Sequence, residues 1–281
     1  MLFSSSVFLF LFLPIVLILY FNPIVKNRTY RNIILLVASL FFYAWGEPVF
    51  VLLMAASIVV NWQIGLAMAG SGRKKTWLVL SVVWNLSLMF VFKYLTFVLS
   101  NVELLLHRNI ADIEISLPLG ISFFTFQILS YIFDLYYGNT KVQKNCYKFA
   151  LYVSMFPQLV AGPIVRYEQI AYEIDHRQGN MEDFSLGMTR FVYGLGKKVL
   201  LSNYMGTIAD NMFYLSGNSN LSAASAWLGG IAYTLQIYYD FSGYSDMAIG
   251  LGRMFGFHFL ENFNYPYVSK SITEFWRRWH M

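Results

Sequence analysis

Residues 3–21 read FSSSVFLFLFLPIVLILYF and contain no charged side chain. A helix of about 20 apolar residues is long enough to cross the hydrocarbon core of a bilayer, so this stretch predicts a first transmembrane helix. It has no basic residues before the apolar run and no obvious small-residue cleavage site. We therefore expect a retained membrane span and not a removable signal peptide.

Comparable apolar stretches recur along the chain and predict a multi-pass membrane protein. We expect further spans at residues 49–69, 77–99, 119–137, 149–165 and 223–257. The apolar run at residues 33–45 would cover only about 20 Å as a helix, so we expect it to be tilted, extended or re-entrant. Residues 184–213 are amphipathic, and we expect Gly194, Gly196 and the two lysines that follow to interrupt them. The predicted fold is an all-α, polytopic transmembrane helical bundle with broken and re-entrant helices.

The composition agrees with a membrane protein. The 281 residues are 57% hydrophobic, 19% aromatic and only 12% charged. Soluble domains are about a quarter charged, so this chain lacks the charge to cover a water-facing surface. The net charge of +5 does not indicate a nucleic-acid partner, because the basic residues lie in short clusters between apolar runs, the pattern that orients membrane proteins. We expect residues 1–281 to form one membrane-embedded domain in contact with lipid.

The segment QIYYDFSGYSD, which starts at Gln236, places ionisable groups inside the last predicted span. Such groups cost about 2.5–3.5 kcal/mol each at the centre of a span and persist where they face a cavity, a partner or water. Gln236, Asp240 and Tyr244 are four apart and share one helix face. A helix break at Gly243 would let Asp240 and Asp246 point into one cavity. The alternative is that these residues cap a helix end at the membrane interface.

The segment FPQLVAGP at residues 156–163 contains three helix-breaking residues, Pro157, Gly162 and Pro163. Prolines free backbone carbonyls and interrupt a helix. Inside a membrane, such a break is tolerated where the backbone is buried in protein or lines a cavity. A simple kink is the alternative interpretation.

The four histidines differ in context. His107 and Asp112 have the H-x-x-x-x-D spacing of one class of glycerolipid acyltransferases, but they lie in a short charged loop without the soluble fold of that class. His176 and His258 are expected to be solvated or interfacial. His280 ends the run WRRWH, which on spacing alone fits an interfacial anchor as well as a site. The sequence has no motif for a metal site, a nucleotide loop or a serine nucleophile.

Several stretches together resemble the membrane-bound O-acyltransferase superfamily, and within it the bacterial branch that includes the alginate O-acetyltransferase membrane subunit. They are spread over the whole chain, and any one alone would be a weak signal. The stretches are MLFSSSVFLFL (1–11), FYAWG (42–46), PLGISFFTFQ (118–127), FPQLVAGP (156–163), YDFSGYSDMAIG (239–250) and FWRRWH (275–280).

The resemblance implies a reaction and a central tunnel through the helical bundle. An acyl thioester such as acetyl-CoA serves as donor on the cytoplasmic side, and no permanently bound cofactor is expected. A hydroxyl acceptor receives the acyl group, directly or through a periplasmic or extracytoplasmic acetyltransferase partner. His280 matches the histidine of the family's Trp-His motif and is the expected catalytic residue. The family's second histidine lies further along, so we expect this chain to be incomplete at its C-terminus.

Histidine suits this chemistry, because an imidazole with a pKa near 6.5 can take a proton from a hydroxyl at neutral pH. Asp240 or Asp246 could orient the imidazole, and Arg277 and Arg278 could meet phosphates of the donor. The expected tunnel or substrate-binding residues are Gln236, Tyr239, Asp240, Ser242, Tyr244, Asp246, Asn264, Arg277, Arg278 and Trp279.

The favoured function is O-acetylation of an extracytoplasmic polysaccharide such as alginate, by a protein of the bacterial inner membrane. One alternative is the D-alanyl transferase of teichoic acids, from the same superfamily. A transporter or channel is a second alternative, since broken helices and buried aspartates suit that class, although no pair of related halves is visible. A non-catalytic fragment is the third.

Overall fold

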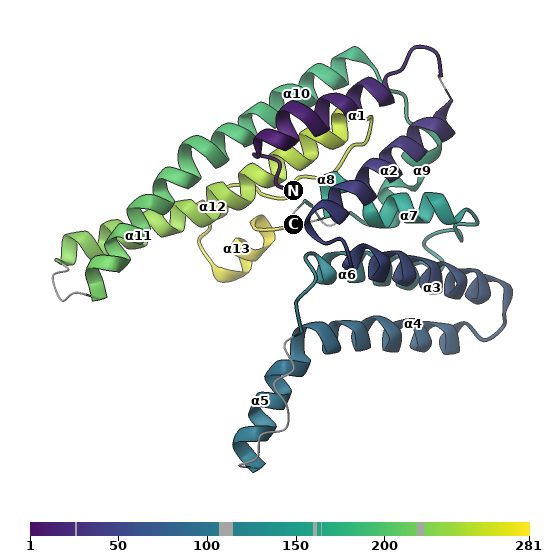
Figure 1. The fold of residues 1–281 in the computed structure, drawn as a ribbon, viewed down its shortest axis with the longest axis horizontal. Helices are drawn as coiled ribbons and strands as arrows, with labels where there is room; N and C mark the ends of the chain where they lie inside the picture. The colour runs from purple at the N-terminus through teal and green to yellow at the C-terminus, as the bar shows by residue number, and fades with distance from the viewer. Residues whose placement is uncertain (26, 107–114, 160–161, 164, 218–221) are drawn as a thin grey trace. The chain divides into compact units, whose positions relative to one another are not determined.

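The computed structural model describes residues 1–25, 27–106, 115–159, 162–163, 165–217 and 222–281. These residues form helices and no β-strand, so the fold is all-α as predicted (Figure 1). The chain forms two compact units: one contains Met1 and residues 16–160 and 164–175, and the other contains residues 2–15, 161–163 and 176–281. The His107–Asp112 pair lies outside the described residues. The single membrane-embedded domain stays a prediction.

The described residues contain the following helical elements. In chain order they are η1 (Phe8–Phe12), α1 (Leu13–Tyr20), α2 (Arg28–Gly46), α3 (Phe50–Gly70), α4 (Lys74–Met89), η2 (Phe90–Tyr94), α5 (Leu95–Leu106), α6 (Ile121–Tyr137), α7 (Cys146–Ser154), α8 (Phe156–Leu159), α9 (Tyr167–His176), α10 (Met181–Gly196), η3 (Lys197–Ser202), α11 (Asn203–Gly217), α12 (Ala223–Met254), η4 (Pro266–Val268) and α13 (Ile272–Arg278).

Two helical stretches within the described residues are long and apolar enough to cross a membrane, namely Phe50–Gly70 and Lys74–Leu106. They coincide with the spans predicted at 49–69 and 77–99. Phe8–Tyr20 is a shorter apolar helix at the position of the first predicted span. By length and composition, the structure thus supports fewer spans than the sequence predicted.

The single span predicted at residues 149–165 is wrong. Helix α7 has only 9 residues, about 14 Å, and it ends because Met155 takes a non-helical backbone with ψ of 114°. The apolar run at 33–45 lies within α2, which starts earlier because the side chain of Asn27 caps it by accepting from the backbone N–H of Thr29. Its polar first turn extends α2 to 19 residues, about 28 Å.

Helices α3 and α4 form a hairpin (Figure 1). Neutral polar side chains join the two helices. Asn61, Ser81 and Asn85 are fully buried between them. Asn61 Oδ1 accepts from Ser81 Oγ at 2.7 Å and from Asn85 Nδ2 at 2.8 Å. Amide and hydroxyl pairs of this kind hold helices together where water is excluded.

The second unit contains two long helical stretches that lie side by side (Figure 1). The stretch α10–η3–α11 runs without a break through Gly194 and Gly196, and a π-helix over Lys197–Ser202 widens it locally. Helix α12 has 32 residues and runs straight through Gly243. The break predicted at Gly243 is therefore wrong. At Gly194, Gly196 and the two lysines that follow, the predicted interruption is limited to a change from α-helix to π-helix at Lys197, through which the helical stretch continues.

The glycines serve close approach of the two helices instead. A Cβ atom on Gly194 would lie 2.5 Å from the carbonyl oxygen of Gly243, and one on Gly187 would lie 2.6 Å from that of Gly250. Real Cβ atoms are not found so close to backbone, so each of these positions needs glycine. The lower-numbered glycine of α10 meets the higher-numbered one of α12, so the helices are antiparallel.

A loop at residues 255–265 leads from α12 to η4. Gly256 has a φ of 83° and turns the backbone after α12. The loop then pairs with the residues that follow α13: the backbone N–H of Asn264 donates to Arg278 at 2.9 Å, and that of Met281 donates to Asn262 at 3.1 Å. This pairing fixes the position of the residues just before Met281.

Candidate functional site

A cavity of about 490 Å³ lies in the second unit, between α10, α12 and the loop that follows α12. Its lining combines charged, amide and hydroxyl side chains with aromatic rings. The lining residues are Arg190, Lys197, Tyr238, Ser242, Ser245, Asp246, Glu261, Asn262, Phe263, Asn264, Tyr265 and Met281.

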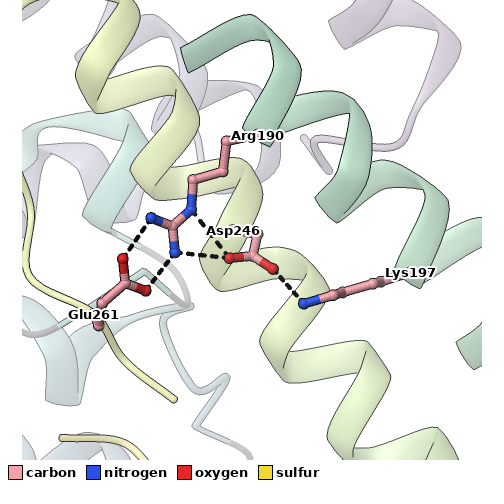
Figure 2. A network of polar contacts seen from close by, with 4 residues as sticks. All are labelled: Arg190, Lys197, Asp246 and Glu261. Atoms are coloured by element: carbon pink, nitrogen blue, oxygen red, sulfur yellow. Dashed lines mark hydrogen bonds and ion pairs between the residues drawn. The ribbon is translucent and has the colours of Figure 1, made fainter. Parts of the chain in front are cut away.

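Four charged side chains form a network along this cavity, and Figure 2 shows the guanidinium of Arg190 between two carboxylates. Arg190 donates from Nε and Nη2 to Asp246 Oδ1 at 3.1 and 2.9 Å. It donates from Nη1 and Nη2 to Glu261 at 2.6 and 2.5 Å. Lys197 reaches the other oxygen of Asp246 at 2.6 Å. Two cations and two carboxylates balance, so the network carries no net charge.

The sequence places both cations of the network on one helix face. Arg190 and Lys197 are seven positions apart, which is about two helical turns. Gly187 and Gly194 have the same spacing, and they bring the backbone of α12 close enough for Asp246 to meet both cations. The side chain of Asp246 is 18% exposed and that of Glu261 is 57% exposed, so the network runs from the helix pair out to the loop.

His280 lies beside this cavity and is held by an amide. Its Nδ1 is 2.8 Å from Oδ1 of Asn262, which is buried. An amide oxygen only accepts hydrogen bonds, so Nδ1 carries the proton and Nε2 keeps a free electron pair in the neutral ring. Burial lowers the pKa of His280 below its ordinary value of 6.5. The neutral imidazole, which can accept a proton, is therefore the dominant form at neutral pH.

The backbone at His280 is unusual. Its φ is 54°, in the left-handed region that non-glycine residues rarely occupy. Such a conformation costs about 1–3 kcal/mol and is found at functional sites, where the surrounding structure enforces it. Here the ring contact with Phe241, at 5.0 Å between centroids, and the bond to Asn262 hold the side chain in place.

Three buried polar atoms around the cavity have no hydrogen-bond partner in the described part of the chain. They are Oγ of Ser242, Oγ of Ser245 and Nδ2 of Asn262. All three residues line the cavity. Buried polar groups are nearly always hydrogen-bonded, so these atoms are available to water or to a bound substrate.

The cavity contains three of the expected site residues, Ser242, Asp246 and Asn264. It does not contain Asp240, which pairs with Lys198 at 2.6 Å. The shared cavity expected for both aspartates is wrong, because α12 is unbroken and residues six apart on a helix point about 120° away from each other.

Other expected residues of α12 meet separate neighbours. The side chain of Gln236 lies against Gly206 of α11. Tyr244 is buried and stacks on Phe3 at 4.5 Å between centroids. Tyr239 is half-buried, with its ring 5.3 Å from that of Tyr238. None of the three expected residues lines the cavity.

The expected residues of α13 act mainly on their own segment. Arg278 bonds to Glu274 at 2.9 Å and to the backbone carbonyl of Asn264 at 3.3 Å. Trp279 packs edge-on against Phe263, with ring centroids 5.0 Å apart. Arg277 is exposed. The contacts of Arg278 and Trp279 hold in place the segment that carries His280.

The three expected helix-breaking residues are buried. Pro157 lies in the four-residue helix α8, just after α7 has ended. Gly162 and Pro163 are not helical, and both are buried. Both residues between α8 and Gly162 lie outside the described residues, as does the residue that follows Pro163.

Four residues of the site were not predicted from the sequence to belong to one: Arg190, Lys197, Glu261 and Asn262. Lys197 was expected only to interrupt its helix. The seven-residue spacing of Arg190 and Lys197 within an apolar stretch was a usable signal, because it places two cations on one helix face. Glu261 and Asn262 lie in a loop, where no periodic pattern predicts which residue points toward a site.

Comparison with known proteins agrees with the resemblance. Residues 143–281 match the model of the membrane-bound O-acyltransferase family. Over its whole length the chain is 46% identical to the probable alginate O-acetylase AlgI of Pseudomonas aeruginosa, of which it covers 54%. It is 35% identical to the peptidoglycan O-acetyltransferase of Helicobacter pylori, of which it covers 59%.

A more distant match is also present. Over 58% of the chain, the sequence is 29% identical to the teichoic acid D-alanyltransferase of Bacillus subtilis, and the match covers 42% of that protein. The chain thus spans a little over half the length of the two relatives that it matches from end to end. The family model over residues 143–281 and the whole-length identity thus both relate this chain to the membrane-bound O-acyltransferase family, which it resembles.

Proposed function

We propose that the protein is a membrane O-acetyltransferase, or the membrane subunit of one, that moves an acetyl group from a thioester donor to a hydroxyl of a polysaccharide outside the cytoplasm. The family match and the names of the two whole-length relatives support acetyl transfer to a cell-surface polymer. The observation that carries the proposal is the Asn262–His280 pair beside a polar cavity.

In this mechanism His280 acts as a general base. Its Nε2 takes the proton of the acceptor hydroxyl while that oxygen attacks the thioester carbonyl. The new C–O bond forms, the C–S bond breaks, and the thiolate leaves with the proton held by the imidazolium. General-base assistance of this kind contributes about 10²–10⁴-fold to the rate.

The location follows from the same proposal. The donor, acetyl-CoA or another acyl thioester, reaches the protein from the cytoplasm, and the acceptor or an acetyltransferase partner protein lies on the other side of the bacterial inner membrane. The basic clusters at residues 26–31, 73–75 and 141–148 support this orientation, because clusters of lysine and arginine stay on the cytoplasmic side.

The candidate functions differ in the polymer that accepts the acyl group. The relatives include an alginate O-acetylase and a peptidoglycan O-acetyltransferase, so either polymer is a possible acceptor. The match to a teichoic acid D-alanyltransferase keeps D-alanyl transfer as a second candidate, with a different acyl group on the donor. Ester analysis of the isolated cell-surface polymers distinguishes all three outcomes.

The test replaces His280 by alanine in the protein expressed from its complete open reading frame. We expect His280→Ala to lower acetyl ester content of the polymer about 100-fold or more, because the base is lost. The matched control is His258→Ala, whose side chain is 52% exposed and lies 3.6 Å from Asp183, away from the cavity lining. Membrane levels of both variants are measured by immunoblot. Normal esterification by His280→Ala would refute the proposed role of this residue.

A further inference from the structure

The loop at residues 255–265 carries Asn262, the residue that holds His280. This loop has no helix; backbone hydrogen bonds tie Asn262 and Asn264 to the segment that carries His280, and side-chain contacts join the loop to the helix pair. Glu261 directly precedes Asn262 in the chain. Whatever fixes Glu261 therefore also fixes the backbone from which the amide of Asn262 reaches the imidazole.

Arg190 is the contact that fixes Glu261. Its guanidinium makes two hydrogen bonds to Glu261, at 2.6 and 2.5 Å, and two to Asp246, at 3.1 and 2.9 Å (Figure 2). Asp246 lies on α12, so Arg190 of α10 ties the loop to the helix pair. Only a planar guanidinium can bridge two carboxylates in this way, because a lysine ammonium is a point charge without the fork of donors.

We propose that Arg190 is a positioning residue for the transfer reaction, which clamps Glu261 to Asp246 and so holds Asn262 in the place from which it orients His280. This inference rests on the proposed function of His280. The chain of contacts runs from α12 through Arg190 and Glu261 to the loop, and from Asn262 to the imidazole. Arg190 itself does not act on the substrate in this scheme.

The geometry allows the positioning of the loop to be tested separately from the folding of the protein. Glu261 is 57% exposed, and exposed ion pairs contribute little to folding stability. Replacing it by glutamine keeps the shape of the side chain and leaves the pairs of Asp246 with Arg190 and Lys197 intact. Glu261→Gln is therefore the main variant, and Arg190→Lys is the second.

The experiment measures kcat and KM for acetyl-CoA across pH with the complete protein in membranes. We expect each variant to lose about 10–100-fold in kcat, because small misplacement of a catalytic group is costly, while KM changes little. The pH below which kcat declines should rise toward 6.5, because a displaced loop exposes His280 to water and removes the burial that lowers its pKa. The ring is otherwise packed against the uncharged groups Phe241 and Asn262. A simple loss of folded protein would lower kcat equally at every pH.

Arg253→Lys is the matched control. Arg253 pairs with Asp183 at 2.9 Å, so it also joins α12 to α10 through an arginine and an aspartate, but it does not contact Glu261. We expect its kcat to stay within about twofold of the wild type, with an unchanged pH profile. The kcat of the double variant Arg190→Lys/Glu261→Gln should be no lower than that of the less active single variant, because both substitutions break the same clamp.

The outcomes separate this proposal from the one on which it depends. If His280→Ala is inactive while Glu261→Gln and Arg190→Lys keep wild-type kcat and acid limb, the clamp is refuted and the base stands. If Arg253→Lys falls as far as Arg190→Lys, the effect belongs to helix packing and the clamp is again refuted. If His280→Ala is fully active, the proposed function itself fails.

Discussion

Two helix pairs of this protein, α3 with α4 and α10 with α12, are joined by opposite means. Between α3 and α4 the contacts are neutral amides and hydroxyls, which are fully buried and bonded to one another. Between α10 and α12 the backbones approach closely at glycines, and the side chains that cross are charged. Both solutions bring polar groups between apolar helices, but with different results.

The difference separates a structural cluster from a site. The Asn61 cluster satisfies its own hydrogen bonds and does not line the 490 Å³ cavity beside His280. The Arg190 network lines a cavity in which Ser242, Ser245 and Asn262 keep free hydrogen-bonding atoms. A closed polar cluster specifies how helices pack, whereas an open one is able to receive a ligand.

The largest expected effect comes from the glycine contact. Gly194→Ala should destabilise the protein by about 2–3 kcal/mol, because its Cβ would lie 2.5 Å from the carbonyl oxygen of Gly243. Gly196→Ala is the control, since a Cβ there meets nothing within 4 Å, and alanine favours the helix by up to about 1 kcal/mol. Thermal unfolding of the two purified variants in detergent measures both. Equal stability of the two would contradict the close approach of α10 and α12.

The next effect comes from the shared carboxylate. Asp246→Asn should cost about 1–2 kcal/mol, because it leaves Arg190 and Lys197 without the charge that both contact. Its amide group also turns a donor toward one of these cations. Asp210→Asn, in an exposed position of α11, should leave the unfolding temperature unchanged. If both variants melt alike, the charge network does not hold the helix pair.

A smaller effect is expected in the neutral cluster. Asn61→Leu should cost about 1 kcal/mol, because it leaves Ser81 and Asn85 without their acceptor, and such bonds inside membrane proteins are worth about 0.6 kcal/mol on average. Activity per folded molecule should not change. The double variant Ser81→Ala/Asn85→Leu, added to Asn61→Leu, should recover part of the loss, because no polar group is then left unpaired. A further loss in the triple variant would show that the cluster does more than join helices.

The smallest effect concerns pH. Burial lowers the pKa of His280 below 6.5, so the folded protein binds fewer protons there than the unfolded chain. His280 should therefore leave stability unchanged above pH 6.5 and reduce it as the pH falls below that value. The kcat profile should likewise keep its plateau somewhat below pH 6.5 before it declines. His280→Ala should remove this part of the pH dependence of unfolding, and an unchanged dependence would contradict the assignment.

Much of the fold could be predicted from the sequence. The apolar runs gave the positions of α3 and of most of the continuous stretch α4–η2–α5, because helices of this length and composition have few alternatives in lipid. Helix interruptions were predicted less well: Gly194 and Gly243 suggested breaks, yet the helices continue through both. A glycine in a helix can serve a break or a close contact, and only the partner helix decides between them.

By itself, the sequence determined an apolar, all-helical chain that resembles the membrane-bound O-acyltransferase family, and it predicted His280 as the candidate base. Only the tertiary structure decided which charges meet. Arg190 and Asp246 are 56 positions apart, and Asn262 precedes His280 by 18. No periodicity links residues at such separations, because a pattern along one helix reports its buried face and not the partner that covers it. The site therefore depends on how α10, α12 and the following loop pack together.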